Sequence, residues 1–510
     1  MLQSFGSIKN LPRRTRAVAG LFLALLVGVS GLLALRWPYT EERMISGIER
    51  ATGSRVRFET YRMLFLPRPG CAIEKLTLER YAQQPIALAK KVTIQSSWLD
   101  LLTFRKSIRQ VQSHGLHLQI PSPFPPPVQT GSEQGLGKVV IGEFLTTGAI
   151  LDFNANGSST TRLGIRELHL RNVGNTTQVE YATVLDIPHP PGEVKSWGTL
   201  GPFSSPSRGQ IPVAGSFELR GGTLSKYKGL AGSIDGKGTF QGPLENIRVE
   251  GTALAAGFEV NDTGHPMDVR STYRADVNGL SGDVILEAAE AEFLRTRLSV
   301  HGAIKGNHGK SVSMHFVGKR ARTEDLLTMF TRSEQPALKG PIDLRADTDL
   351  TPGDEPFLRR LTLSGTFAIT NATWTRTGTQ EKVNSLSARA RGDKEQVEDR
   401  APARVDHVLS QLTGDVSLKQ GLASLSNVRF QVPGATASGG GTYNLMTKRV
   451  DLKGTVSMAA DASEATSGWK SLLLKPFDRL FRRKKESGAT LPVSITGQYP
   501  KPRYRVGLTK

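Results

Sequence analysis

The sequence predicts a mainly β protein in which repeated hairpin units build a long antiparallel sheet, with few short helices and one N-terminal transmembrane helix. Three observations lead to this prediction. Apolar and polar residues alternate over many short segments after Arg55, a period that is typical of half-buried strands. Short glycine-led motifs recur between and within these segments. One uncharged apolar run lies near the N-terminus, and no comparable run follows it.

The apolar run covers the 19 residues from Ala17 to Leu35. A bilayer core about 30 Å thick needs roughly 20 apolar residues in a helix. No small-x-small cleavage site follows the run, so we expect an uncleaved transmembrane helix over residues 17–36. Four basic residues precede the run: Lys9, Arg13, Arg14 and Arg16. The positive-inside rule therefore predicts that residues 1–16 form a cytoplasmic tail and that the large body lies across the membrane.

Composition is that of a folded soluble body behind this anchor. The chain has 510 residues, 38% of them apolar, and a net charge of +20. Such a charge first suggests nucleic acid, but an aromatic-basic recognition motif is missing, and attraction to anionic lipid is the more natural use behind an anchor. We therefore expect no nucleic-acid partner. The single cysteine, Cys71, excludes an intramolecular disulfide and is expected to be a small buried apolar residue.

The N-terminal region, residues 37–120, is predicted to hold a juxtamembrane helix and then strands. Thr40 is a candidate N-cap, Glu41 and Glu42 suit the first turn, and Gly53 marks the end. A Pro-rich linker is expected over residues 121–137.

Further along the chain, residues 138–387 are predicted to form a central β region, residues 388–410 a charged loop, and residues 411–510 a C-terminal β region. Within the central region, Ile187–Pro212 is interpreted as irregular, and Thr323–Arg332 as a short helix capped by Thr323. Alternating aspartates at 343, 347 and 349 indicate the solvated side of a strand.

Five motifs combine a leading glycine with an apolar or aromatic residue two positions later; they begin at Gly215, Gly238, Gly365, Gly414 and Gly441. They resemble degenerate repeats of a hairpin unit, in which glycine serves a turn or bulge. Coincidence in a chain with 53 glycines is the alternative.

An amphipathic basic helix, or a pair broken at Pro476, is predicted near residues 463–485. From Lys470 to Lys510 the net charge is +9. Two interpretations stay open: a lid over the end of the sheet, or contact with an anionic membrane or partner. The candidate membrane-surface residues are Trp469, Leu472, Leu473, Lys475, Phe477, Arg479, Leu480, Phe481 and Arg482.

The sequence offers no catalytic constellation. His114 and His117 have neither cysteine nor carboxylate neighbours in the sequence, and the G-x-S-x-G elbow, the P-loop and the dinucleotide fingerprint are missing. We therefore expect a protein that is not an enzyme and that needs no metal or cofactor.

Three segments resemble the AsmA-like family of bacterial inner-membrane-anchored envelope proteins, which includes the larger TamB and YhdP types. The first is Ala51–Arg80, with its Thr-Gly-x-x-Val, Pro-x-Pro-Gly and Leu-x-Leu series just after the anchor. The second runs from Gly414 to Val456 and continues through LLLKPFDRLF and GATLPVSITGQYPKPRYRVG. The segment GTLGPFSSPSRGQIPVAGSFELRGG is also similar.

The resemblance implies an elongated, curved antiparallel sheet with an apolar groove that projects into the periplasm. It further implies phospholipids and the inner membrane as partners, together with other envelope or outer-membrane proteins, and a role in lipid transport to the outer membrane and in its integrity. Side chains expected to line the groove are Val416, Leu418, Val428, Phe430, Val432, Val450, Leu452 and Val456. The alternative is a non-catalytic structural or assembly factor for outer-membrane proteins, with a closed core.

Overall fold

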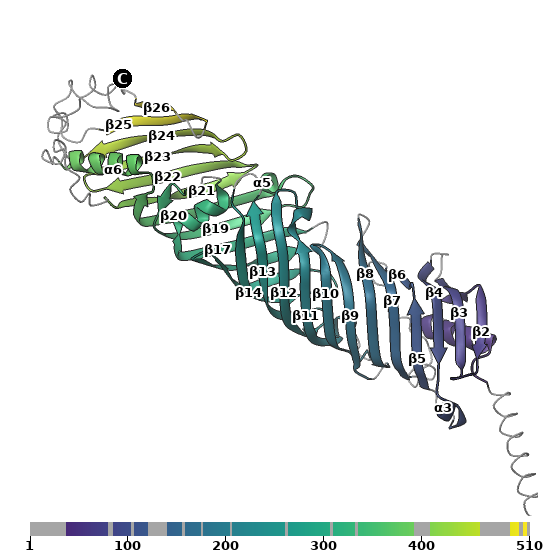
Figure 1. Ribbon diagram of the computed structural model, residues 1–510. Helices are drawn as coiled ribbons and strands as arrows, with labels where there is room; N and C mark the ends of the chain where they lie inside the picture. Colours follow the sequence, from purple (N-terminus) through teal and green to yellow (C-terminus); the bar gives the residue numbers. More distant parts are fainter. Residues whose placement is uncertain are drawn as a thin grey trace, which may run out of the picture. The chain divides into compact units, whose positions relative to one another are not determined.

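The described part of the chain is mainly β, and the 26 strands found there belong to one mixed sheet. Figure 1 labels most of these strands. The chain divides into two compact units, unit 1 (Met1–Leu185 and Trp197–Pro206) and unit 2 (Asp186–Ser196 and Ser207–Lys510). The described residues of this computed structural model are 37–79, 85–103, 107–120, 140–155, 159–174, 177–203, 207–260, 264–305, 310–331, 335–391, 408–458, 490–498 and 503–506.

Unit 1 carries two described helices, α2 (Glu41–Thr52) and α3 (Trp98–Leu102). Its strands are β1 (Arg55–Arg57), β2 (Thr60–Leu64), β3 (Gly70–Glu79), β4 (Pro85–Gln95), β5 (Ser107–His114), β6 (His117–Ile120), β7 (Val140–Ala155), β8 (Ser159–Val173) and parts of β9 (Val179–Pro188) and β10 (Pro191–Leu200).

The pairing in unit 1 departs from the expected antiparallel pattern. β1 and β2 pair with β3, β3 pairs with β4, and β4 pairs with both β5 and β6, all antiparallel. β5 and β6, however, run parallel to β7. Parallel neighbours need a connection of about a dozen residues or more, and residues 121–139 provide that length between β6 and β7. The prediction of a wholly antiparallel sheet was therefore wrong at this point.

The core of unit 1 lies under α2, on one face of β3–β5. Cys71 and Ile73 are 0% and 1% exposed, and Met44 and Ile48 of α2 pack on the cluster that contains them. As predicted, α2 begins after Thr40 and ends at Gly53, whose φ of 64° suits glycine. The Thr40 side chain makes no capping hydrogen bond. Burial raises the pKa of the Cys71 thiol to about 11.

Unit 2 is a succession of strands in which each neighbour is antiparallel. From β11 to β17 each strand pairs with the next, β17 pairs with β19, and from β19 to β26 each strand again pairs with the next, while the short β18 pairs with β20. The strands are β11 (Pro212–Thr223), β12 (Leu230–Pro243), β13 (Ile247–Val260), β14 (Met267–Val277), β15 (Val284–Phe293), β16 (Thr296–Lys305), β17 (Ser311–Arg322), β18 (Leu338–Lys339), β19 (Pro341–Leu350), β20 (Leu361–Trp374), β21 (Ser410–Lys419), β22 (Leu422–Val432), β23 (Ala435–Asn444), β24 (Arg449–Met458), β25 (Thr490–Gln498) and β26 (Arg503–Val506).

Three described α-helices belong to unit 2: α4 (Thr323–Phe330), α5 (Phe357–Arg360) and α6 (Thr377–Ala390). Two single 3₁₀ turns, η2 (Arg208–Gln210) and η3 (Leu224–Lys226), complete the regular structure of its described part. The sequence predicted α4 but not α6.

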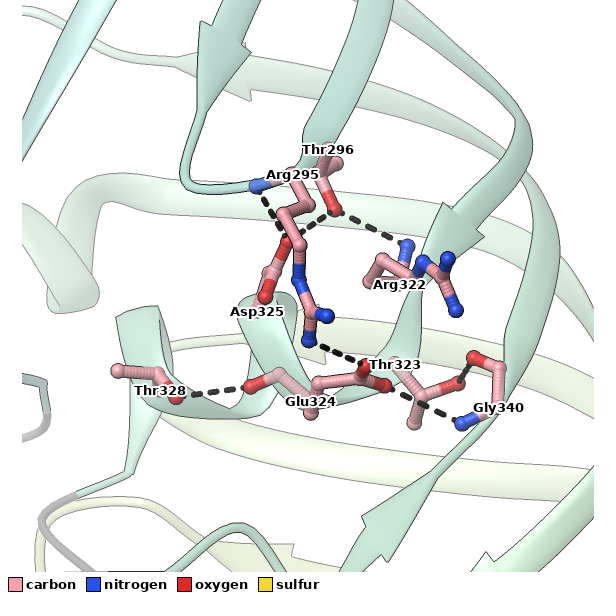
Figure 2. Close-up of polar contacts among 8 residues, drawn as sticks. All are labelled: Arg295, Thr296, Arg322, Thr323, Glu324, Asp325, Thr328 and Gly340. Carbon is pink, nitrogen blue, oxygen red and sulfur yellow. Dashed lines mark hydrogen bonds and ion pairs between the residues drawn. The ribbon is translucent and has the colours of Figure 1, made fainter.

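A buried polar network holds the N-terminus of α4 (Figure 2). The Asp325 carboxylate accepts hydrogen bonds from the Arg295 backbone N–H and the Thr296 hydroxyl, both at 2.9 Å. Glu324 accepts from the Arg295 guanidinium at 3.1 Å and from the Gly340 N–H at 3.2 Å. Glu324 and Asp325 are both buried, and negative charge at a helix N-terminus is favourable. The network therefore fixes where α4 lies on the sheet.

The start of α4 corrects one detail of the sequence analysis. Arg322 is the N-cap and Thr323 is already helical, with its hydroxyl donating to the Gly340 carbonyl at 2.9 Å.

A second correction concerns Ile187–Pro212, which was interpreted as irregular. Nearly half of this tract forms the end of β9 and the whole of β10, two paired strands. The backbone can extend through prolines at strand ends, which composition alone does not show.

Several predicted segments lie outside the described residues. They include the tail at 1–16, the transmembrane helix at 17–36, the linker at 121–137 and the basic helix near 463–485. Of the charged loop at 388–410, residues 388–390 end α6, Ser410 begins β21, and 392–407 are not described. Among the described residues, no helix has the length and apolar character that crossing a bilayer requires.

Candidate functional site

The two sides of the unit 2 sheet differ sharply in chemistry. Directly paired residues of antiparallel strands share a side of the sheet, so the registers trace rows of side chains across β11–β26. One row contains no charged residue, and we call its side the apolar face. Its members are Phe217, Gly238, Gly251, Tyr273, Ala289, Val300, Phe316, Ala346, Gly365, Val416, Leu425, Gly441, Leu452, Ile495 and Tyr504.

The opposite side, which we call the charged face, carries the alternate residues of the same strands. A row there runs Glu218, Lys237, Thr252, Thr272, Glu290, Ser299, Val317, Arg345, Thr366 and Asp415. Burial follows the same alternation from Asp235 to Gln241 in β12 and from Asp343 to Asp349 in β19: the charged-face residues are exposed and the apolar-face residues are half-buried. The apolar-face side chains of these strands are thus partly shielded from solvent, whereas those of the charged face are not.

Glycines of the recurring motifs let aromatic rings lie close over the apolar face. A Cβ at Gly238 would come within 2.9 Å of the Phe217 ring, and one at Gly414 within 3.1 Å of the Phe367 ring. Each of these rings belongs to one motif and each glycine to another, on the paired strand. The interpretation as a turn or bulge residue was therefore wrong for Gly238, whereas Gly414 does lie where the β21–β22 register shifts. These two lie inside strands, where a neighbouring ring takes the space of a side chain.

All eight predicted groove residues lie on the apolar face. Val416 is in the row given above, and Val428 lies in the adjacent row opposite Gly439. Leu418 and Val450 belong to a third row, joined through Ala423 and Tyr443. A bulge between Leu425 and Val428, with Asn427 at φ 52°, keeps both residues on the same side despite their odd spacing.

Three of the eight, Val428, Phe430 and Leu452, line one open hollow of about 150 Å³ on the apolar face. Leu425, Val493 and Ile495 complete its apolar walls, and three glycines, Gly439, Gly440 and Gly454, contribute to its floor. Leu425, Val493 and Ile495 are not among the eight residues predicted for the groove. The alternation of apolar residues in their own short strands is the sequence signal that could have identified them. In the structure, each of the three pairs directly with a residue of the Val416 or Val428 row.

Val432 and Val456 have a different environment. Both belong to a compact cluster in which Val383 and Ala390 of α6 pack on β22–β24. The Ser387 hydroxyl donates to the Pro433 carbonyl at 2.8 Å, and the Gln380 amide donates to the Val408 carbonyl at 3.0 Å. α6 thus covers this end of the strands, whereas the hollow at Val428 stays open.

The charged face is held by cross-strand pairs rather than by apolar packing. Arg274 pairs with Glu250 at 2.9 Å, and Arg297 pairs with both Glu290 and Glu292. His301 stacks on His315, which contacts Asp347. A wide hollow of about 780 Å³ is lined largely by residues of this face, among them Glu218, Arg220, Asp235, Lys237, Arg270, Glu290 and Glu292.

The alternating aspartates contact neighbours on this face, as the sequence analysis expected of a solvated strand side. Asp343 accepts from the Arg320 N–H at 2.7 Å, and all three aspartates are exposed. Within the described residues, no three histidine, cysteine or acidic side chains are arranged to hold a metal ion.

One polar cluster lies in unit 1. The Asp152 carboxylate, 8% exposed, accepts two hydrogen bonds from Arg162 at 2.8 and 3.1 Å and contacts His117 Nε2 at 2.7 Å. The Arg162 hydrogen bonds, followed by that of His117, lower the pKa of Asp152 to about 2. His114, the other histidine of the predicted pair, contacts Thr147 instead. Each histidine thus has a different partner.

Comparison with known proteins adds no identification: no family model, curated protein or solved structure matches this chain. The nine residues predicted for the membrane-surface helix, Trp469 to Arg482, lie outside the described residues.

Proposed function

We propose that this protein is an inner-membrane-anchored periplasmic protein whose apolar face binds the acyl chains of phospholipids. The observation that carries the proposal is the apolar face itself, a set of uncharged rows that crosses β11–β26 with half-buried side chains. A strand side of this kind must be covered by apolar material. α4 and α6 pack on parts of it, through Leu326 and Leu327 and through Val383 and Ala390.

Acyl chains suit the uncovered part better than a small polar ligand. The hollow at Val428, Phe430 and Leu452 is walled by aliphatic and aromatic side chains, and apolar contact needs no directional partner. The headgroup would stay in water, where charged groups keep their hydration. Binding of this kind requires no nucleophile, metal or cofactor, and the resemblance to the AsmA-like family supports lipid transport toward the outer membrane as the setting.

The test uses two neighbouring residues that face opposite ways. Leu452 lines the hollow on the apolar face, whereas Asp451, its neighbour on β24, is exposed and does not line the hollow. A photo-crosslinking amino acid replaces each residue in turn in the full-length protein, expressed in a bacterial envelope. We expect mass spectrometry to find phospholipid attached at position 452 and several-fold less at position 451.

Equal capture at the two positions would contradict the proposal, because it would mean that lipid contacts are unspecific. Capture of protein alone at position 452 would favour the assembly-factor alternative. Lipid extraction from the purified wild-type chain provides an independent measure of bound phospholipid.

A further inference from the structure

A second apolar surface belongs to unit 1, where residues of β2, of the turn after β2 and of α3 contribute to it. Five large apolar side chains form it, and we call them the end patch: Met63, Phe65, Leu66, Leu99 and Leu102. Leu66 is 84% exposed, Leu99 72%, Phe65 51%, and Met63 and Leu102 are each 47% exposed. Large apolar side chains gathered at such exposure are typical of interaction sites.

The two segments that carry the end patch are fixed side by side. Trp37 stacks on Phe65 with ring centroids 5.1 Å apart and lies 5.9 Å from the ring of Trp98, the first residue of α3. The Ser96 N–H donates to the Pro69 carbonyl at 2.9 Å. The turn after β2 and the turn of α3 therefore present their leucines from one rigid framework.

The position of Trp37 in the chain indicates what covers the patch. Trp37 follows the uncharged run Ala17–Leu35 by two residues, so the patch is tied to the point where the chain leaves its most apolar segment. Tryptophan with leucine and phenylalanine is the composition favoured at a membrane interface. Exposed Arg62 and Arg68 flank the patch, and arginine attracts anionic headgroups.

We propose that the end patch inserts into the bilayer surface beside the anchor, with Leu66 and Leu99 at acyl-chain level. This inference rests on the membrane anchor of the proposed function. Insertion would fix the orientation of unit 1 on the membrane, since two separated segments contact the bilayer in addition to the single anchor.

The test measures depth in the membrane with a fluorescent label. Full-length protein carrying Leu66→Cys or Leu99→Cys is labelled with an environment-sensitive dye and reconstituted in vesicles of phosphatidylethanolamine and phosphatidylglycerol. Cys71 is fully buried, so the label goes to the introduced thiol. Leu88→Cys, at a 37% exposed leucine of β4 outside the patch, is the matched control.

We expect a quencher on the lipid acyl chain to reduce fluorescence at positions 66 and 99 several-fold more than at position 88, and iodide in the water to show the opposite order. Equal quenching at positions 66 and 88 would overturn the inference. Protection of position 66 from both quenchers would also overturn it, because a protein would then cover the patch.

Vesicle flotation and crosslinking at Leu452 separate this inference from the proposed function. If the chain floats with vesicles and captures lipid at position 452 while position 66 stays in water, the inference alone fails. If positions 66 and 99 are embedded but position 452 captures no lipid, the proposed function alone fails.

Discussion

The apolar rows of the two units differ in how far they are buried. In unit 1, Cys71 pairs with Ile94 and Ile94 with Val111, and all three are buried beneath α2, Trp37 and Tyr39. In unit 2, the rows through Val428 and Leu452 stay half-buried and border an open hollow. Strands with the same alternation therefore make a closed core or an open apolar surface, depending on what packs on them. The segments that pack on the strands, and not the strand pattern, therefore decide whether an apolar side forms a structural core or the proposed binding surface.

The largest expected effect tests whether unit 1 has a closed core while the apolar face of unit 2 is open. Ile73→Asp puts a charge at a 1% exposed position of the closed core, and we expect loss of about 4 kcal/mol or more of unfolding free energy. Val428→Asp, on the half-buried apolar face, should leave the fold intact and reduce bound phospholipid. Chemical denaturation and lipid extraction measure the two outcomes. If Val428→Asp unfolds the chain as Ile73→Asp does, both regions are closed cores.

The next effect concerns the partial cover that α4 gives to unit 2. Asp325→Ala removes the acceptor for the Arg295 N–H and the Thr296 hydroxyl, which should cost about 2–3 kcal/mol because the buried donors lose a charged partner. Hydrogen exchange should increase in α4 and at Arg295, with α2 of unit 1 unchanged. Thr328→Val, on the same helix but with its hydroxyl donating only to the Glu324 carbonyl, is the control. Comparable losses in the two variants would contradict the role of the network.

A smaller effect is expected from the glycines under the aromatic rings. Gly414→Val inserts a side chain against the Phe367 ring and Val428, and overpacking of this kind costs about 1–3 kcal/mol. Gly378→Ala in α6 meets no atom within 4 Å and should be neutral or stabilising, since alanine favours helices. Denaturant midpoints compare the two. A Gly414→Val protein as stable as the wild type would show that the ring has room to move.

The smallest expected effect is a dependence of the stability of unit 1 on pH, through Asp152. The folded pKa of Asp152, about 2, lies below the unfolded value of about 3.9. Its ion pair therefore stabilises unit 1 fully above pH of about 4, and this contribution is lost as the pH falls toward 2. Asp152→Asn should flatten the acid side of the stability curve of unit 1, measured by hydrogen exchange in β7 and β8. An unchanged acid transition would contradict this. The effect is modest because Arg162 is 65% exposed to screening solvent.

The alternation of residues predicted much of this architecture. A period of two predicted that Val428 to Val432, and likewise Val450 to Val456, each have one apolar strand side, and the registers place these residues on one face together with Val416 and Leu418. The short helix after Thr40 was predicted to within a residue, because its cap position and Gly53 are local signals.

Other features depend on distant segments. The parallel pairing of β5 and β6 with β7 joins residues on either side of 121–139. α6 packs on Trp374, just before it, and also on β22–β24, which follow it by 30 residues or more. α6 has few apolar residues, so its pattern was weak; Gln380 and Ser387 hold it through hydrogen bonds to Val408 and Pro433. No local pattern contains these partners.

The sequence by itself determined that the chain is mainly β and that its strands have one apolar and one polar side, because side chains alternate across a strand whatever its neighbours are. Only the tertiary structure decided which apolar residues are covered. Ile73 and Val428 follow the same local rule, yet α2 closes over the first and an open hollow borders the second. Burial depends on which segments meet in space, and that is a property of the whole fold.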